Sequence, residues 1–142
     1  MKALIESIYW DALGLGACNK FTGREDMDGI IRLLFSPQGR EFCIKNRFPS
    51  RQTFRKFLKY NPELHGVYID AGRVILKEPK NVFLVGRTQA TIHFEDIENH
   101  NVCLLHGAKA TIYAGGRSVV RIESDDASKC NVIKTGRAVV IG

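Results

Sequence analysis

The fold is decided by two stretches of sequence, Asn-Val-Phe-Leu-Val-Gly-Arg-Thr-Gln-Ala-Thr-Ile over residues 81–92 and Asn-Val-Cys-Leu-Leu-His-Gly-Ala-Lys-Ala-Thr-Ile over residues 101–112. They begin twenty residues apart and agree at six of twelve positions, where ordinary composition gives on the order of one match by chance. A repeat of this length, built from short β-branched segments and turn residues, is typical of a β-solenoid coil. Equivalent side chains of successive coils then stack about 4.8 Å apart.

The alignment also predicts which apolar residues stack. We expect ladders of Val82 over Val102 over Val132, and of Leu84 over Leu104. A third, degraded copy begins at Asn131 and reproduces the Gly-Arg pair of residues 86–87 at residues 136–137. About three coils therefore fit after Asn81, with residues 67–76 as an irregular first rung. An antiparallel sandwich or barrel is the alternative, because its strands also recur every 8–12 residues.

The first 65 residues carry a helical period instead. Apolar residues line one side of residues 3–13, and Asp26 or Asp28 can cap a second helix. Ser36-Pro37 starts a third helix, and Ser50 caps a fourth over residues 51–60. The fold class is therefore α+β: a helical cap segment (1–65) followed by a short single-stranded parallel β-solenoid, or β-helix (66–142). We expect one cooperative domain, with the helices covering an apolar end of the solenoid.

Positive charge is concentrated in one segment of the chain. The formal net charge is +6, and residues 40–59 hold seven Lys and Arg residues against Glu41 alone. Arg51, Arg55 and Lys59 recur at i, i+4 and i+8, which places them on one helical stripe. We expect Phe54, Phe57 and Leu58 to fill the opposite face.

This basic segment is the strongest candidate binding feature. Aligned cations contact a phosphate backbone in many nucleic-acid-binding proteins. The two helices around the break at residues 46–49 resemble a helix-turn-helix in length, with Thr53 near the groove-facing side. The candidate nucleic-acid-binding residues are Arg47, Arg51, Arg55, Lys56 and Lys59. A solvated helix face and a surface for an acidic protein partner are the alternatives.

Four motifs carry a resemblance to known proteins. They are the runs over residues 35–43, 48–55, 66–70 and 106–112, within a region from about residue 30 to 120. In these runs the chain resembles a group of small bacterial proteins associated with mobile elements. The resemblance implies a short helical cap and a strand-rich repeat, and it implies no established activity or site residue.

Residues that could carry catalysis or bind metal are sparse. His100-x-x-Cys103-x-x-His106 offers zinc-ligand types, but residues three apart on a strand point to opposite faces. We therefore expect no metal there, and none with His93. The acidic pairs 25–26, 95–96 and 125–126 are expected to form turns. The four cysteines, at 18, 43, 103 and 130, are expected to be reduced thiols.

Composition limits the class of protein. With 44% hydrophobic and 25% charged residues, the chain is that of an ordinary globular domain. No apolar run approaches the roughly 18 residues that span a bilayer, and Glu6 interrupts any signal-peptide core. We expect a cytoplasmic protein that is not an enzyme and has no cofactor. Its predicted function is that of a binding or scaffold module acting on a protein partner through a solenoid face, with nucleic-acid binding as the alternative.

Overall fold

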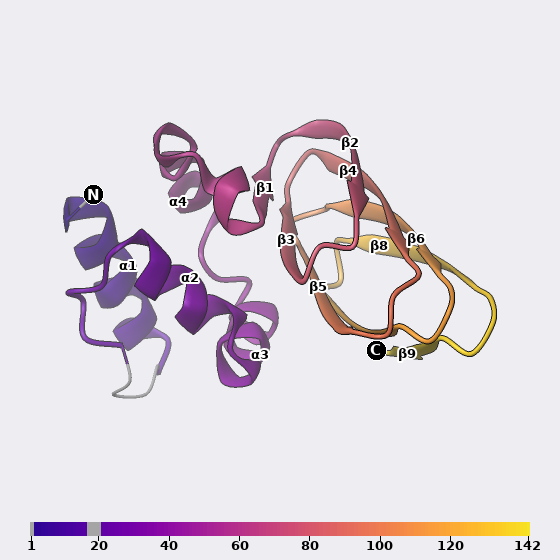
Figure 1. The fold of residues 1–142 in the computed structure, drawn as a ribbon. Helices are drawn as coiled ribbons and strands as arrows, with labels where there is room; N and C mark the ends of the chain where they lie inside the picture. The colour runs from indigo at the N-terminus through magenta and orange to yellow at the C-terminus, as the bar shows by residue number, and fades with distance from the viewer. Residues whose placement is uncertain (1, 17–20) are drawn as a thin grey trace. The chain divides into compact units, whose positions relative to one another are not determined.

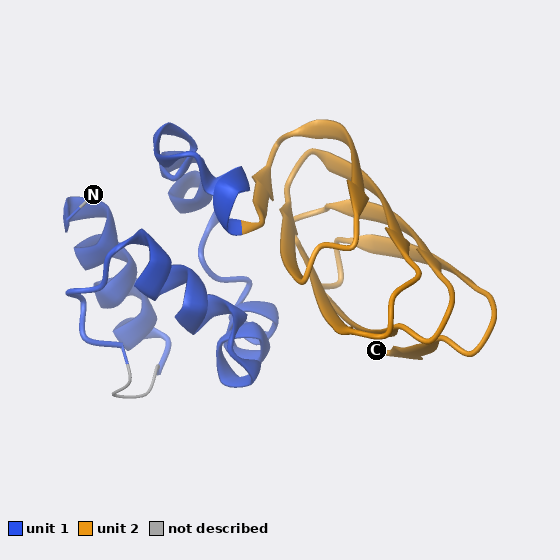
Figure 2. Ribbon diagram, in the orientation of Figure 1, with its two compact units in different colours: residues 1–65 blue, residues 66–142 orange. Residues whose placement is uncertain are grey.

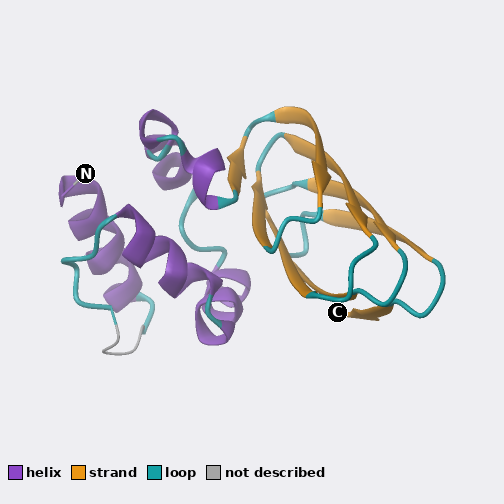
Figure 3. Cartoon of the chain, in the orientation of Figure 1, coloured by secondary structure: helices purple, strands orange, loops and turns teal. Residues whose placement is uncertain are grey.

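The computed structural model describes residues 2–16 and 21–142. Cys18, one of the four cysteines considered above, lies outside these residues. The chain divides into two compact units, residues 1–65 and 66–142 (Figure 2). In the described residues, the helices lie in the first unit and the strands in the second (Figure 3).

The first unit is built from short helices. They are α1 (Lys2–Gly14), α2 (Met27–Phe35), α3 (Pro37–Asn46), α4 (Arg51–Lys56), and the 3-10 helices η1 (Leu58–Tyr60) and η2 (Pro62–His65). The apolar stripe of α1 is buried through Leu4, Ile5, Ile8 and Ala12. No helix in the described part of the chain is long and apolar enough to cross a membrane.

Three side chains fix the starts of these helices. The Asp26 carboxylate accepts a hydrogen bond from the Gly29 N–H at 2.7 Å, and Ser36 Oγ accepts one from the Gly39 N–H at 3.0 Å. Ser50 Oγ accepts one from Thr53 N–H at 3.1 Å. Each bond satisfies a backbone donor that the first helical turn leaves unpaired. The predicted capping residues are therefore confirmed, with Asp26 rather than Asp28 in the second helix.

The second unit is a parallel β-solenoid with two strands in each coil (Figure 1). One sheet has the order β1-β3-β5-β7-β9 and the other β2-β4-β6-β8. The strands are β1 (Val67–Ile69), β2 (Gly72–Lys77), β3 (Asn81–Val85), β4 (Thr88–Phe94), β5 (Asn99–Leu105), β6 (Lys109–Ala114), β7 (Val119–Ser124), β8 (Lys129–Lys134) and β9 (Val139–Ile141). The chain thus makes four complete coils before β9.

The register confirms the twenty-residue repeat. Val82 pairs with Val102 and Leu84 with Leu104, in parallel. The first coil is shorter, because Val67 pairs with Phe83 only sixteen positions later, which confirms the irregular first rung. Antiparallel sandwiches and barrels are excluded for this unit, since every strand pair described is parallel.

The expected place of Val132 in the first ladder is wrong. Val102 is followed in its sheet by Ile122, whereas Val132 lies in the other sheet beside Ile112. Asn131 comes thirty residues after Asn101, which is one and a half coils. The apparent third copy is therefore a match between the two halves of a coil.

The core of this unit lies between the two sheets. Alternate side chains of every strand point inward, and the resulting cluster includes Val82, Leu84, Ile92, Val102, Leu104 and Ile112, none more than 1% exposed. Cys43, Cys103 and Cys130 are reduced cysteines rather than disulfides. The coil corners use left-handed backbone, for example at Gly86, Gly116 and Gly136, because glycine adopts it without a Cβ clash.

Candidate functional site

The basic segment differs from the predicted helix. The α-helix ends at Lys56, and Lys59 lies in the separate 3-10 helix η1. The three cations at i, i+4 and i+8 therefore do not lie on one continuous helix. Arg47 ends α3 in the left-handed conformation. All five candidate cations are exposed: Arg47, Arg51, Arg55, Lys56 and Lys59.

The opposite side of this segment is only partly as expected. Phe54 and Phe57 are buried as predicted, but Leu58 is 48% exposed. Thr53 is buried, and the Ser50 hydroxyl donates to its Oγ1 at 3.0 Å, so it does not lie on an exposed groove-facing side. The Lys59 ammonium lies 5.4 Å from the ring centre of Tyr60, within the range of a cation–π contact.

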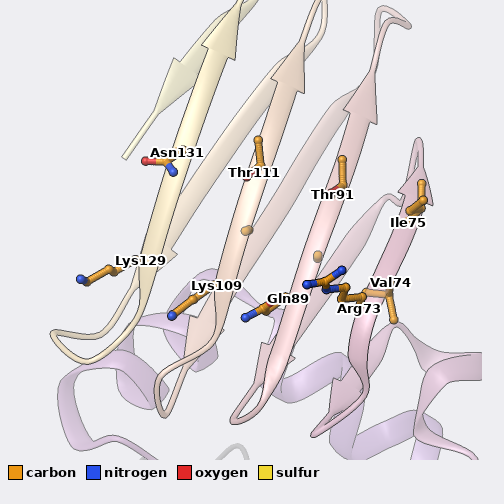
Figure 4. A pocket seen from close by; sticks show the side chains of 11 residues that line it. Arg73, Val74, Ile75, Gln89, Thr91, Lys109, Thr111, Lys129 and Asn131 are labelled. Carbon is orange, nitrogen blue, oxygen red and sulfur yellow. The ribbon is translucent and has the colours of Figure 1, made fainter.

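The solenoid offers a second and larger surface, which we call the outer sheet face. It consists of the outward side chains of β2, β4, β6 and β8, which stack in three ladders. The ladders are Arg73, Gln89, Lys109 and Lys129; Ile75, Thr91, Thr111 and Asn131; and Lys77, His93, Tyr113 and Ile133. Figure 4 shows the first two ladders side by side. The sequence repeat alone does not identify this face, because it predicts that Val132 stacks on Val102 in the other sheet.

The outer sheet face is hollowed and positively charged. A shallow depression of about 500 Å³ follows its first two ladders from Arg73 to Lys129. A second depression of about 500 Å³ adjoins it and adds Arg87 to the lining. The twelve outward residues include four Lys or Arg and no carboxylate. On the third ladder, the rings of His93 and Tyr113 stack with centres 4.9 Å apart and planes 6° apart.

A third feature lies at one corner of the solenoid, where His100 meets two carboxylates. His100 is 3% exposed, and its Nδ1 lies 2.7 Å from the Pro79 carbonyl oxygen. Its Nε2 lies 2.8 Å from Asp96 Oδ1 and 3.6 Å from Glu78 Oε2. We refer to Glu78, Asp96 and His100 as the corner cluster. It is the one group of potential metal-ligating side chains found among the described residues.

The neighbouring side chains of the corner cluster affect the pKa of the Asp96 carboxyl. Desolvation raises the pKa of the Asp96 carboxyl, but interactions with the His100 and Glu78 side chains and the Glu98 N–H lower that pKa overall. Both ring nitrogens of His100 face oxygen acceptors, so an imidazolium with a hydrogen on each nitrogen satisfies both. Glu78 Oε2 is buried and has no hydrogen-bond partner.

His100 meets Glu78 and Asp96 rather than Cys103 and His106, the residues with which its spacing groups it in the sequence. His100 pairs in register with the core residue Val120, and Cys103 pairs with Glu123 on the alternate positions of the strand. His100 and Cys103 therefore point to opposite faces of β5, as their spacing predicts. His106 adopts a left-handed corner conformation, and its N–H donates to Asp125 Oδ2 at 2.8 Å. Asp125 is thus a turn-forming residue, as expected for its acidic pair.

The chain was compared with protein-family models, curated proteins and solved structures, and none of them matches it.

Proposed function

We propose that this protein is a non-catalytic binding module that docks an acidic partner protein on its outer sheet face. The observation that carries the proposal is the charge of that face. Residues 66–142 contain ten Lys and Arg residues against eight acidic ones, an excess of two. The outer sheet face alone has an excess of four. The remainder of the unit is therefore net negative, and the positive potential is concentrated on one face.

The composition of the face favours a protein partner over a nucleic acid. Its cations stand beside exposed apolar and aromatic side chains: Ile75 is 80%, Tyr113 42% and Ile133 42% exposed. Mixed aromatic, apolar and cationic surfaces are typical of protein interfaces, whereas nucleic-acid surfaces are more strongly basic. Parallel pairing holds the backbone rigid, so little ordering entropy is lost when the partner docks.

The test uses two matched triple variants and affinity capture from an extract of the source cells. The face variant is Arg73→Glu, Lys109→Glu, Lys129→Glu. The control variant is Lys80→Glu, Arg117→Glu, Arg137→Glu, which changes three exposed cations of the same unit that lie off the face. We expect an acidic protein that the wild type and the control retain and the face variant loses, with and without nuclease. Equal capture by both variants refutes the proposal, and nuclease-sensitive capture indicates nucleic acid instead.

Nucleic-acid binding through the basic segment is the second candidate. It is supported by the exposure of Arg47, Arg51, Arg55, Lys56 and Lys59 within thirteen residues of the chain. Closely spaced exposed cations contact several phosphates at once, and such binding weakens with added salt. The triple variant of the outer sheet face leaves all five unchanged, so the two candidates are separable.

A further inference from the structure

We propose that the corner cluster, Glu78, Asp96 and His100, binds one divalent transition-metal ion, and that zinc fits it best. Glu78 comes from one corner of the solenoid, and Asp96 and His100 come from the equivalent corner of the next coil. Glu78 follows β2 in the left-handed conformation, Asp96 lies between β4 and β5, and His100 belongs to β5. Their ligand atoms all lie within 4.8 Å of one another. One imidazole and two carboxylates are ligand types that zinc takes together with a water molecule.

Each of the three side chains is oriented by a second partner. His100 Nδ1–H donates to the Pro79 carbonyl oxygen, which leaves Nε2 directed at the carboxylates. The Glu95 N–H donates to Glu78 Oε1, so the other oxygen, Oε2, faces His100. The Glu98 N–H donates to Asp96 Oδ1 at 3.1 Å. Metal-binding histidines typically donate their second N–H to a carbonyl or carboxylate in this way, and their carboxylate neighbours are hydrogen-bonded too.

The hydrogen bonding of Glu78 also supports a cation at this position. Glu78 Oε2 is a buried oxygen that accepts no hydrogen bond, and His100 Nε2 lies 3.6 Å from it. A buried carboxylate oxygen without a hydrogen-bond donor is costly. The two carboxylates bring two negative charges to one point, and a divalent ion neutralises both while giving Glu78 Oε2 a ligand bond. The ion binds His100 at Nε2, the ring nitrogen that faces the carboxylates, in place of a proton that passes to solvent.

The dimensions fit zinc with a small adjustment. With bonds of 2.0–2.1 Å, the ligands of a tetrahedral zinc ion lie about 3.3 Å apart. The Nε2 to Glu78 Oε2 distance is 3.6 Å, and the Nε2 to Asp96 Oδ1 distance is 2.8 Å, so the Asp96 carboxylate must withdraw by ~0.5 Å. The Asp96 and Glu78 side chains are 30% and 28% exposed. Both can move, and both leave access for the ion and its water.

The first experiment is a calorimetric titration of the full chain, freed of metal by chelation, with zinc chloride. We expect one zinc ion per chain with micromolar or tighter affinity. Glu78→Gln and Asp96→Asn should each weaken binding at least about tenfold, since each removes an anionic ligand. The control is His65→Gln, because His65 pairs with the Asp28 carboxylate at 2.9 Å and belongs to no three-ligand group among the described residues. We expect it to bind zinc as the wild type does.

X-ray absorption of the zinc-loaded protein supplies the second readout. We expect a first shell of nitrogen and oxygen without sulfur. Absence of zinc binding in the wild type overturns the proposal. So does a zinc affinity in Glu78→Gln and Asp96→Asn that equals the affinity of the wild type. A sulfur shell overturns it as well, because the ion then sits on cysteine. Both variants change partly exposed side chains, and circular dichroism of each confirms that the solenoid is folded.

Discussion

Truncation of Leu104 to alanine tests the parallel solenoid in its core. Leu104 is fully buried and pairs with the equally buried Leu84 in the preceding coil. The substitution removes three carbon atoms, worth about 2.4 kcal/mol at ~0.8 kcal/mol for each buried CH₂. Because β3 and β7 hold β5 on both sides, the site cannot collapse fully, and the cavity adds to the cost. We expect a total of about 3–4 kcal/mol, within the range for buried leucines.

Urea unfolding measures this cost. With a urea dependence of about 2 kcal/mol/M, the midpoint should fall by roughly 1.5–2 M. Leu64→Ala is the matched control, because Leu64 is 83% exposed and its truncation should cost less than about 0.5 kcal/mol. A loss of less than about 1 kcal/mol for Leu104→Ala would refute its place in the core.

The same experiment tests whether the two units unfold together. Trp10 is the only tryptophan and lies in α1, so its fluorescence reports on the helical unit. Far-ultraviolet circular dichroism reports on both units. If the chain is one cooperative domain, as the sequence predicts, Leu104→Ala shifts both transitions equally. A fluorescence transition that stays in place contradicts that prediction.

Three further predictions concern separate features. If Arg51, Arg55 and Lys59 contact phosphates, the logarithm of the duplex DNA binding constant should fall with the logarithm of salt concentration with a slope of roughly −3. Lys59→Gln should reduce the size of this slope by about 1 unit and the control Lys45→Gln should not, and no binding at about 100 μM protein in low salt refutes the contact. Burial raises the pKa of the Cys130 thiol to about 11, so at pH 8 we expect this thiol to be alkylated ~200-fold more slowly in the folded protein than in protein unfolded by urea. Mass spectrometry measures both rates, and equal rates contradict the prediction. Gly107→Ala should lower the free energy of unfolding by about 1–2 kcal/mol, because its backbone is left-handed. Gly116→Ala should lower it by at least about 1 kcal/mol more, because the added Cβ would lie 2.3 Å from the Glu95 carbonyl oxygen, and equal losses in urea melts would refute this clash.

The repeat was predictable because it leaves identical residues at a fixed period. Asn81 and Asn101 illustrate the reason, since the Asn101 amide donates to Asn81 Oδ1 at 2.7 Å across adjacent coils. Such stacking favours the same residue type at equivalent positions of adjacent coils. The half-coil register was not predictable from the same signal. Both sheets place an apolar residue inward at alternate positions, so Asn-Val at 131–132 matches either strand of a coil equally well.

In the helical unit, the starts of the helices could be predicted from the sequence, but the end of α4 could not. Capping serines and aspartates act within three residues, so Asp26, Ser36 and Ser50 could be identified from sequence. The end of α4 depends on tertiary packing instead. Phe54 and Phe57 are both buried, and their rings lie 6.0 Å apart. The helix passes into 3-10 geometry after them, although no residue from 51 to 60 is a helix breaker.

The corner cluster lies where the coil length changes, and this explains why its residues meet. Four positions separate Lys77 from Asn81 at the corner of the first coil, whereas eight separate their partners His93 and Asn101 at the next corner. The longer corner carries Asp96 and His100. It must close over a shorter one, and His100 turns inward to reach Pro79 O. Where successive corners differ in length, side chains from both coils can meet at one point. Where the corners have the same length, each side chain stacks on the equivalent residue of the next coil. The sequence signal for such a site is therefore not a metal motif but a four-residue change in repeat length flanked by carboxylates and a histidine.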